Sequence, residues 1–284
     1  MCRLILGVLG RAQRLFQVKI CNLACLSNHI HLLLVVDDAE QLSSFMEYVN
    51  SNIAREVGRL VDWQEKFWGR RYHAIVVSDE PEAQEERYRY ILSQGVKEGL
   101  VEKVRDWPGI HGARASLDSE PLQGYWFDRT REGAARRRGE EPGELEYATE
   151  EKVVLSPPPC WQHWSEEKIR ARVAELVEDI EKESEADRQS RGVKVLGAKA
   201  ILAQSPHQKP KQTKRSPAPG FHAATKAARL ALRDAYALFL AAYQEAAEKL
   251  RSGDRLVRFP EGAFPPALPF VRGALDQAWR LAAA

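Results

Sequence analysis

The spacing of hydrophobic residues changes from helical to strand-like early in the chain. Apolar residues recur at helical spacing over residues 4–16, whereas residues 17–27 and 29–36 are rich in Val, Ile and Leu. Ser27 and Asn28 separate the two apolar stretches and favour a tight turn. The pattern predicts a helix followed by a β-hairpin.

A helix, a strand and another helix are predicted next. Asp38 is a suitable N-cap for the first of these, and residues 72–77 predict the strand. Asp79 as N-cap, with Pro81 in the first turn, predicts the start of the last helix, and Gly95 predicts its end. The helix after Asp38 has an apolar stripe that should cover the sheet, formed by Leu42, Phe45, Met46, Val49, Ile53, Val57 and Leu60.

This order of elements predicts an α+β fold, namely a ferredoxin-like module with an antiparallel sheet whose first strand is missing. The first strand of such a sheet lies at its centre, so its loss would leave backbone groups unpaired. We therefore expect the chain to be an N-terminally shortened version of a longer protein that has an additional strand upstream.

Composition predicts three parts along the chain. Residues 1–117 form the α+β domain, and residues 118–160 form a charged and Pro-rich linker in which we expect poor order, especially over 129–151. Residues 161–284 form a mainly helical extension, interrupted by a basic Pro-rich linker at 206–220.

Within the extension, helical spacing predicts one helix that starts after Ser165 and ends near Arg188, and an alanine-rich helix over 222–251. The Pro-rich segment 259–269 should lack regular structure. A last short helix is predicted after it.

Charge and cysteine content limit the possible classes of protein. The formal net charge of the 284 residues is +2, so a nucleic-acid surface must come from local clusters of Arg and Lys. The four cysteines have neither zinc-ligand spacing nor the density of a disulfide-rich secreted domain, which favours a cytoplasmic location. No apolar run approaches the roughly 20 residues that cross a bilayer, so we expect no membrane association.

The candidate chemistry lies in two short segments. His29 and His31 are spaced so that a strand would place both imidazoles on one face, which is half of a metal site. Tyr90 and Gln94 are one helical turn apart. A phenol beside a metal suggests covalent phosphodiester chemistry.

The chain from about residue 3 to 110 resembles the single-tyrosine HUH transposases of insertion sequences, especially the REP-associated tyrosine transposases. The resemblance rests on the His-hydrophobe-His strand, on Tyr-Ile-x-x-Gln beginning at Tyr90, and on Phe-Trp-Gly-Arg-Arg-Tyr-His at 67–73. Residues 95–101, Gly-Val-Lys-Glu-Gly-Leu-Val, are similar to the family's Asn-Pro-Val-Lys-x-Gly-Leu-Val, with Gln94-Gly95 in place of Asn-Pro.

The resemblance implies cleavage and rejoining of single-stranded or hairpin DNA through a 5′-phosphotyrosine. Tyr90 would be the nucleophile, and His29, His31 and Gln94 would bind a divalent metal, Mg or Mn. A homodimer is also compatible with the family. Six further residues are candidates for DNA binding through stacking or charge: Trp68, Arg70, Arg71, Arg87, Arg89 and Lys97.

Alternatives stay open at this point. The protein could be a catalytically inactive DNA-binding derivative, or a replication or mobilisation nuclease that uses the same chemistry. The two histidines could simply be hydrogen-bonded within a sheet, and Trp68 could anchor a loop. Tyr88 is a second candidate nucleophile, although helical geometry directs it away from the face shared by Tyr90 and Gln94.

Overall fold

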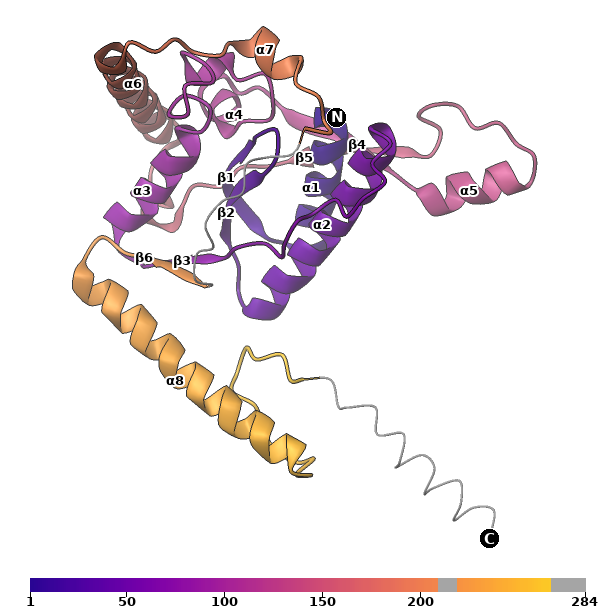
Figure 1. Cartoon of the computed structure of the whole chain (residues 1–284), viewed down its shortest axis with the longest axis vertical. Coiled ribbons are helices and arrows are strands. Elements are labelled where there is room, and N and C mark those ends of the chain that lie inside the picture. Colours follow the sequence, from indigo (N-terminus) through magenta and orange to yellow (C-terminus); the bar gives the residue numbers. More distant parts are fainter. Residues whose placement is uncertain (209–218, 267–284) are drawn as a thin grey trace. The chain divides into compact units, whose positions relative to one another are not determined.

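The computed structural model describes residues 1–208 and 219–266 (Figure 1). Residues 1–229 form one compact unit, and a second unit begins at Leu230. The last short helix predicted from the sequence, and residues 209–218 of the predicted basic linker, lie outside the described residues.

The N-terminal elements have the predicted types and order. They are α1 (Cys2–Phe16), β1 (Lys19–Cys25), β2 (Ile30–Val35) and α2 (Ala39–Leu60). β1 and β2 pair in antiparallel fashion, and Asp38 caps α2 by accepting a hydrogen bond from the Gln41 backbone N–H at 2.7 Å. The hairpin lies between α3 (Pro81–Leu92) and the pair of helices α1 and α2 (Figure 1).

The sheet of this unit differs from the predicted single antiparallel sheet. In the described part of the chain, the strands form three two-stranded sheets, so the fold is mixed α and β with small sheets. β1 is buried, because residues 110–111 and 155–156 hydrogen-bond along the edge that faces away from β2. The outer edge of β2 pairs with no strand among the described residues.

The expectation of poor order over 129–151 is wrong. The region contains α5 (Arg129–Arg137) and most of β5 (Ala148–Val153), which pairs in antiparallel fashion with the preceding strand β4 (Leu122–Phe127). The hairpin packs directly on α1, where glycines allow backbone-to-backbone contact: a Cβ atom on Gly7 would lie 2.1 Å from the Tyr125 carbonyl carbon. Glu151 is buried in this contact and pairs with Arg11 at 3.1 Å and Arg14 at 2.8 Å.

α3 begins and ends slightly differently from the prediction. Its N-cap is Glu80 instead of Asp79, and the helix ends at Leu92, before Gly95, which lies in the following turn with a φ of 88°. The Glu80 side chain does not cap α3 but accepts hydrogen bonds from the segment 224–225. That segment follows β6 (Gly220–His222), which pairs in parallel with β3 (Ile75–Val77).

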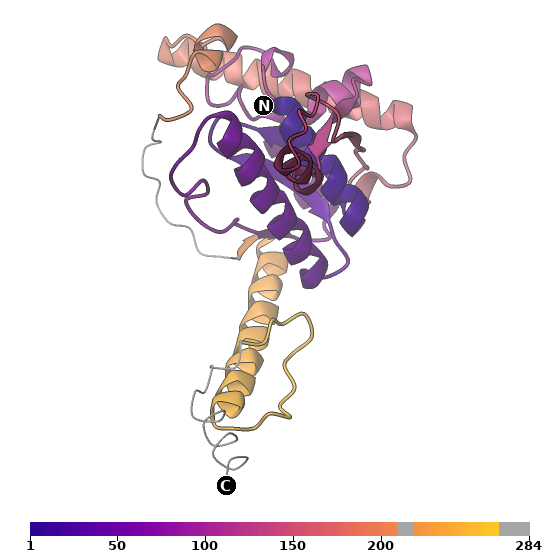
Figure 2. The ribbon, with the colours of Figure 1, turned by 90° about the vertical axis from the view of Figure 1, so that its right-hand side faces the viewer.

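A second core joins α3 to α6 (Glu166–Arg191), which is seen along its length in Figure 2. Ser165 is its N-cap, as predicted. The remaining elements around this core are η1 (Val104–Asp106), α4 (Gly112–Asp118), η2 (Pro159–Trp161) and α7 (Ala198–Leu202). The core consists mainly of Tyr88, Leu92, Val96, Val101, Val104, Trp107, Trp161, Val173, Leu176, Val177 and Ile180.

The alanine-rich helix predicted over 222–251 is α8 (Lys226–Arg251).

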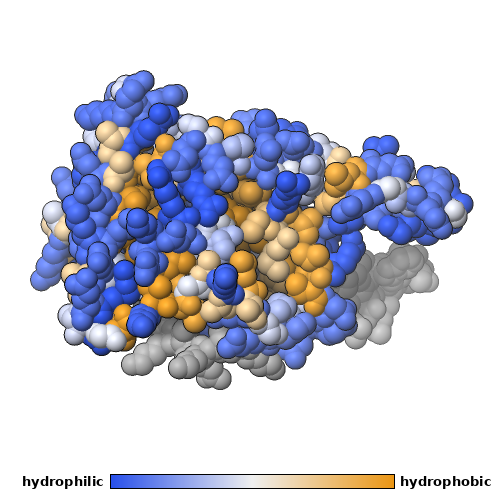
Figure 3. All heavy atoms as spheres, turned by 90° about the horizontal axis from the view of Figure 1, so that it is seen from above, coloured by the Kyte–Doolittle hydropathy of each residue, from blue (hydrophilic) through white to orange (hydrophobic). Residues whose placement is uncertain are grey.

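Seen from above, the surface is largely hydrophilic, with apolar side chains gathered between the charged ones (Figure 3). None of the helices in residues 1–208 and 219–266 has both the length and the apolar character to span a membrane.

Candidate active site

The start of β2, with the residue before it, and the last turn of α3 bring three of the predicted site residues together. The ring centroids of His29 and His31 are 4.7 Å apart, and those of His31 and Tyr90 are 5.6 Å apart. Both pairs meet edge to face. The imidazoles therefore lie side by side, as the two-residue spacing predicts, although β2 begins at Ile30 and His29 precedes the strand.

Gln94 lies one turn beyond Tyr90, just after the end of α3. Its side chain is buried, with a relative exposure of 2%, and its amide Nε2 donates a hydrogen bond to the Tyr90 carbonyl oxygen at 2.7 Å. Because the amide nitrogen is engaged there, the amide oxygen is left as the acceptor group. This oxygen is a suitable ligand for a hard divalent cation.

The surroundings of the two histidines favour the neutral imidazole, which is the form that binds metals. Burial, followed by the nearby His29 and Lys97, lowers the pKa of His31 to about 4. Burial also lowers the pKa of His29, whose Nδ1 contacts Asn28 Oδ1 at 2.6 Å. The Gln94 side chain lies close enough to the His31 imidazole to act on its pKa, which it raises, but the buried Nε2 of His31 has no partner with hydrogen-bond geometry among the described residues.

These observations fit a divalent cation held by His29, His31 and Gln94. A buried, unpartnered imidazole nitrogen is unfavourable unless it binds a proton donor or a cation. The described part of the chain contains no cluster of three His, Cys, Asp or Glu side chains that could hold a metal. The metal-ligand set proposed from the sequence is not such a cluster, because its third ligand is the side-chain amide of Gln94.

Tyr90 and Tyr88 lie in contrasting environments. Tyr90 has a relative exposure of 40%, whereas Tyr88 has 3% and packs against Trp161 with its hydroxyl 3.3 Å from Ser116 Oγ. Burial raises the pKa of Tyr88 to about 12. Of the two tyrosines, Tyr90 is the one that a DNA strand could reach.

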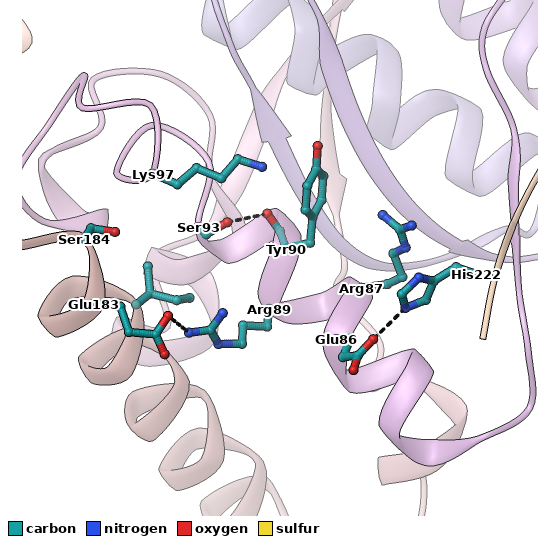
Figure 4. A pocket seen from close by; sticks show the side chains of 10 residues that line it. Glu86, Arg87, Arg89, Tyr90, Ser93, Lys97, Glu183, Ser184 and His222 are labelled. Carbon is teal, nitrogen blue, oxygen red and sulfur yellow. Dashed lines mark hydrogen bonds and ion pairs between the residues drawn. The ribbon is translucent and has the colours of Figure 1, made fainter. Parts of the chain in front are cut away.

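Two cations flank the Tyr90 ring. Lys97 Nζ lies 3.4 Å from the ring centroid, and the guanidinium carbon of Arg87 lies 5.4 Å from it. A pocket of about 390 Å³ opens beside them (Figure 4). It is lined by Glu86, Arg87, Arg89, Tyr90, Ser93, Lys97, Ile180, Glu183, Ser184 and His222.

The walls of this pocket come partly from elements that the sequence analysis did not connect with Tyr90. α6 contributes Glu183, whose carboxylate pairs with Arg89 at 2.6 Å. β6 contributes His222, whose Nε2 lies 3.0 Å from Glu86 Oε2. Neither residue lies in a local motif, so no signal in the sequence pointed to it.

The other candidates for DNA binding do not line the pocket. Trp68 donates a hydrogen bond from Nε1 to the Asn50 carbonyl oxygen at 2.8 Å, as expected for a residue that anchors a loop. It also packs against the core that α1, β1 and α2 form. Arg70 and Arg71 are exposed, and the Arg71 guanidinium lies over the Tyr72 ring. Their role in DNA binding stays a prediction.

Comparison with known protein families gives a match within the chain. Residues 5–94 match the model of a family described as "Transposase IS200 like". This segment is an IS200-like transposase domain of the single-tyrosine HUH family, and it contains His29, His31, Tyr90 and Gln94. Such a domain implies DNA binding and transposase-type endonuclease activity on single-stranded DNA. No curated protein and no solved structure matches the chain.

Proposed function

We propose that the protein cleaves and rejoins single-stranded DNA by nucleophilic attack of Tyr90. The observation that carries this proposal is the position of the exposed Tyr90 ring beside the paired imidazoles of His29 and His31. A divalent metal, Mg or Mn, held by these histidines and Gln94 would polarise the scissile phosphate.

In the first step, Tyr90 Oη forms a bond to phosphorus as the bond from phosphorus to the 3′-oxygen breaks. The phenol proton is lost and the departing 3′-oxygen gains one, so the products are a 5′-phosphotyrosine and a free 3′-hydroxyl. In the reverse direction, a 3′-hydroxyl attacks the phosphotyrosine and joins the strands. The bond energy is retained in the protein–DNA linkage, which suits strand transfer.

Tyr90 is well placed to present its hydroxyl to DNA. Its ring is fixed by His31 and Lys97, and the backbone carbonyl of the same residue accepts hydrogen bonds from Gln94 and Ser93. The nucleophile and the proposed ligand Gln94 are therefore linked through one helical turn. A closer relationship to REP-associated transposases, and a palindromic or hairpin target, are parts of the proposal that rest on the sequence resemblance.

The direct test is formation of a covalent adduct with labelled single-stranded hairpin DNA in the presence of Mg²⁺ or Mn²⁺. We expect the wild type to give an adduct on a denaturing gel, and Tyr90→Phe and His31→Ala to reduce it to background. Tyr88→Phe is the matched control, because it removes a hydroxyl from the same helix, and it should retain the adduct.

Loss of the adduct in Tyr88→Phe but not in Tyr90→Phe would show that the nucleophile is assigned wrongly. DNA binding by the wild type without any adduct would favour the inactive derivative over the enzyme.

A further inference from the structure

Arg87 is a half-buried cation that forms no ion pair with a carboxylate in the described part of the chain. Its Nε is buried without a hydrogen-bond partner, and no ion pair to Arg87 is found in residues 1–208 and 219–266. Its guanidinium nevertheless lies beside the proposed nucleophile. Guanidinium groups bind phosphate oxygens well, so this unmatched charge is suited to a phosphodiester.

A competing carboxylate lies next to Arg87 but is held by another residue. Glu86 is close enough to act on the Arg87 charge, yet its carboxylate is directed to His222 at 3.0 Å. Figure 4 shows the Arg87 guanidinium on the side of the pocket near Tyr90, with the Glu86–His222 pair below it. The contact is close without the geometry of a hydrogen bond, and it orients the Glu86 carboxylate towards the imidazole.

His222 is fixed in place by the end of β3 and the start of α3. Its carbonyl oxygen accepts a hydrogen bond from the Ser78 backbone N–H at 2.9 Å. Just beyond it, Thr225 Oγ1 donates to Glu80 Oε1 at 2.7 Å, and the Ala224 backbone N–H donates to Glu80 Oε2 at 2.9 Å. The imidazole thus belongs to a well-bonded turn, although it lies far beyond the transposase domain in the sequence.

We propose that this pocket binds a phosphate of the DNA strand next to the scissile one, with Arg87 as its ligand and His222 as a positioning residue that holds Glu86 aside. The Tyr90 hydroxyl points away from His222 in Figure 4, so the pocket takes a neighbouring phosphate instead of the reacting one. This inference rests on the proposed function, because a strand that reaches Tyr90 must pass the pocket.

The test measures binding of a labelled single-stranded oligonucleotide by fluorescence anisotropy, with the full chain carrying Tyr90→Phe so that no cleavage occurs. Arg87→Ala should weaken binding about tenfold. It should also reduce the slope of log K against log salt concentration by about 0.7, the value for one phosphate contact on a single strand.

His222→Ala should weaken binding by about threefold to fivefold, because the released Glu86 carboxylate competes with phosphate for Arg87. Adding Glu86→Gln to His222→Ala should restore the affinity, which would not happen if His222→Ala merely unfolded the protein. His163→Ala, which removes an exposed imidazole outside the pocket, is the matched control and should leave binding unchanged.

Unchanged binding in Arg87→Ala would overturn the subsite, and failure of Glu86→Gln to rescue His222→Ala would overturn the role of His222. These outcomes are separate from the adduct assay. If the wild type forms the adduct but the Arg87 and His222 variants bind DNA normally, the proposed function stands and the phosphate subsite is rejected. If the variants bind as expected but no adduct forms, the subsite is supported and cleavage by Tyr90 is rejected.

Discussion

His111 shows how a buried histidine can contribute to stability without taking part in chemistry. It is the N-cap of α4, and its Nδ1 accepts a hydrogen bond from the Ala113 backbone N–H at 3.2 Å. Burial, followed by the nearby Arg114, lowers the pKa of His111 to about 4. The unfolded chain titrates near 6.5, so between these values the unfolded state binds more protons than the folded one.

The contribution of His111 to stability is therefore present above about pH 6.5 and is lost as the pH falls towards 4. His111→Asn keeps an N-cap acceptor but removes the titrating ring. Urea unfolding at a series of pH values should show that the wild type loses up to about 3 kcal/mol more than this variant over that range. His163→Asn is the control and should follow the wild type; an identical pH dependence for His111→Asn would contradict the assignment.

The candidate site was predictable where its residues depend on local periodicity. His29 immediately precedes β2 and still lies beside His31 as the strand period predicts, and Gln94 lies two residues beyond α3 and still contacts Tyr90 as the helical period predicts. His222 and Glu183 could not be found in this way, because they reach the pocket through the pairing of β6 with β3 and the packing of α6 on α3. Such contacts between distant segments leave no local pattern.

α6 makes two charged contacts with the helix that carries the proposed nucleophile. Arg172 pairs with Glu85, and Glu183 pairs with Arg89. Helical spacing predicted α6 from its sequence, but not the element against which the helix packs. In the structure, the buried apolar residues of α6 lie in the same core as Tyr88 and Leu92 of α3. α6 thus packs against α3, which carries the proposed nucleophile. Its Glu183 also forms an ion pair with Arg89 of α3.

Glu183→Gln should increase the affinity for single-stranded DNA by about twofold to fivefold. The change releases Arg89 for phosphate and removes a negative charge from the rim of the pocket. Glu178→Gln removes the same charge from the same helix but breaks only a pair with Lys182, so it is the matched control. Binding isotherms at low salt would show the effect, and equal affinities for the two variants would count against a role for the Glu183–Arg89 pair.

The hairpin of β4 and β5 was missed because its sequence is rich in charges. Alternation in β5 is carried by polar residues, and Glu151 occupies a buried position that is normally apolar. Its burial is compensated by Arg11 and Arg14 of α1. The charged composition of the hairpin therefore indicated a solvated linker. The ion pairs that stabilise the hairpin could not be predicted from it, because their basic partners lie in α1, more than 100 residues earlier in the chain.

The contact of α1 with this hairpin unites the first part of the chain with residues beyond the transposase domain. Gly124 of β4 also approaches α1 closely, since a Cβ atom there would lie 1.9 Å from the Arg3 carbonyl oxygen. Only residues without a side chain allow backbones to approach this closely. The division of the chain into domains at 117 and 160 stays a prediction.

Gly7→Ala should destabilise the protein by about 3 kcal/mol, because the added methyl group would force α1 away from Tyr125. Gly133→Ala is the matched control: it is also a glycine in a helix, but its new Cβ would meet only the end of the Arg137 side chain at 3.5 Å. This control should be neutral or stabilising by up to about 1 kcal/mol. Equal free energies of unfolding for both variants would show that α1 does not depend on the close contact.

The close backbone contacts at Gly7 of α1 and Gly124 of β4 bear on whether the transposase domain, residues 5–94, can fold alone. The boundaries by which a family is recognised and the boundaries within which a chain folds cooperatively need not coincide. A fragment cut at residue 94 would keep every group of the proposed chemistry, yet it would lack the backbone against which α1 rests and the segments that cover β1. Inactivity of such a fragment would therefore say nothing about Tyr90.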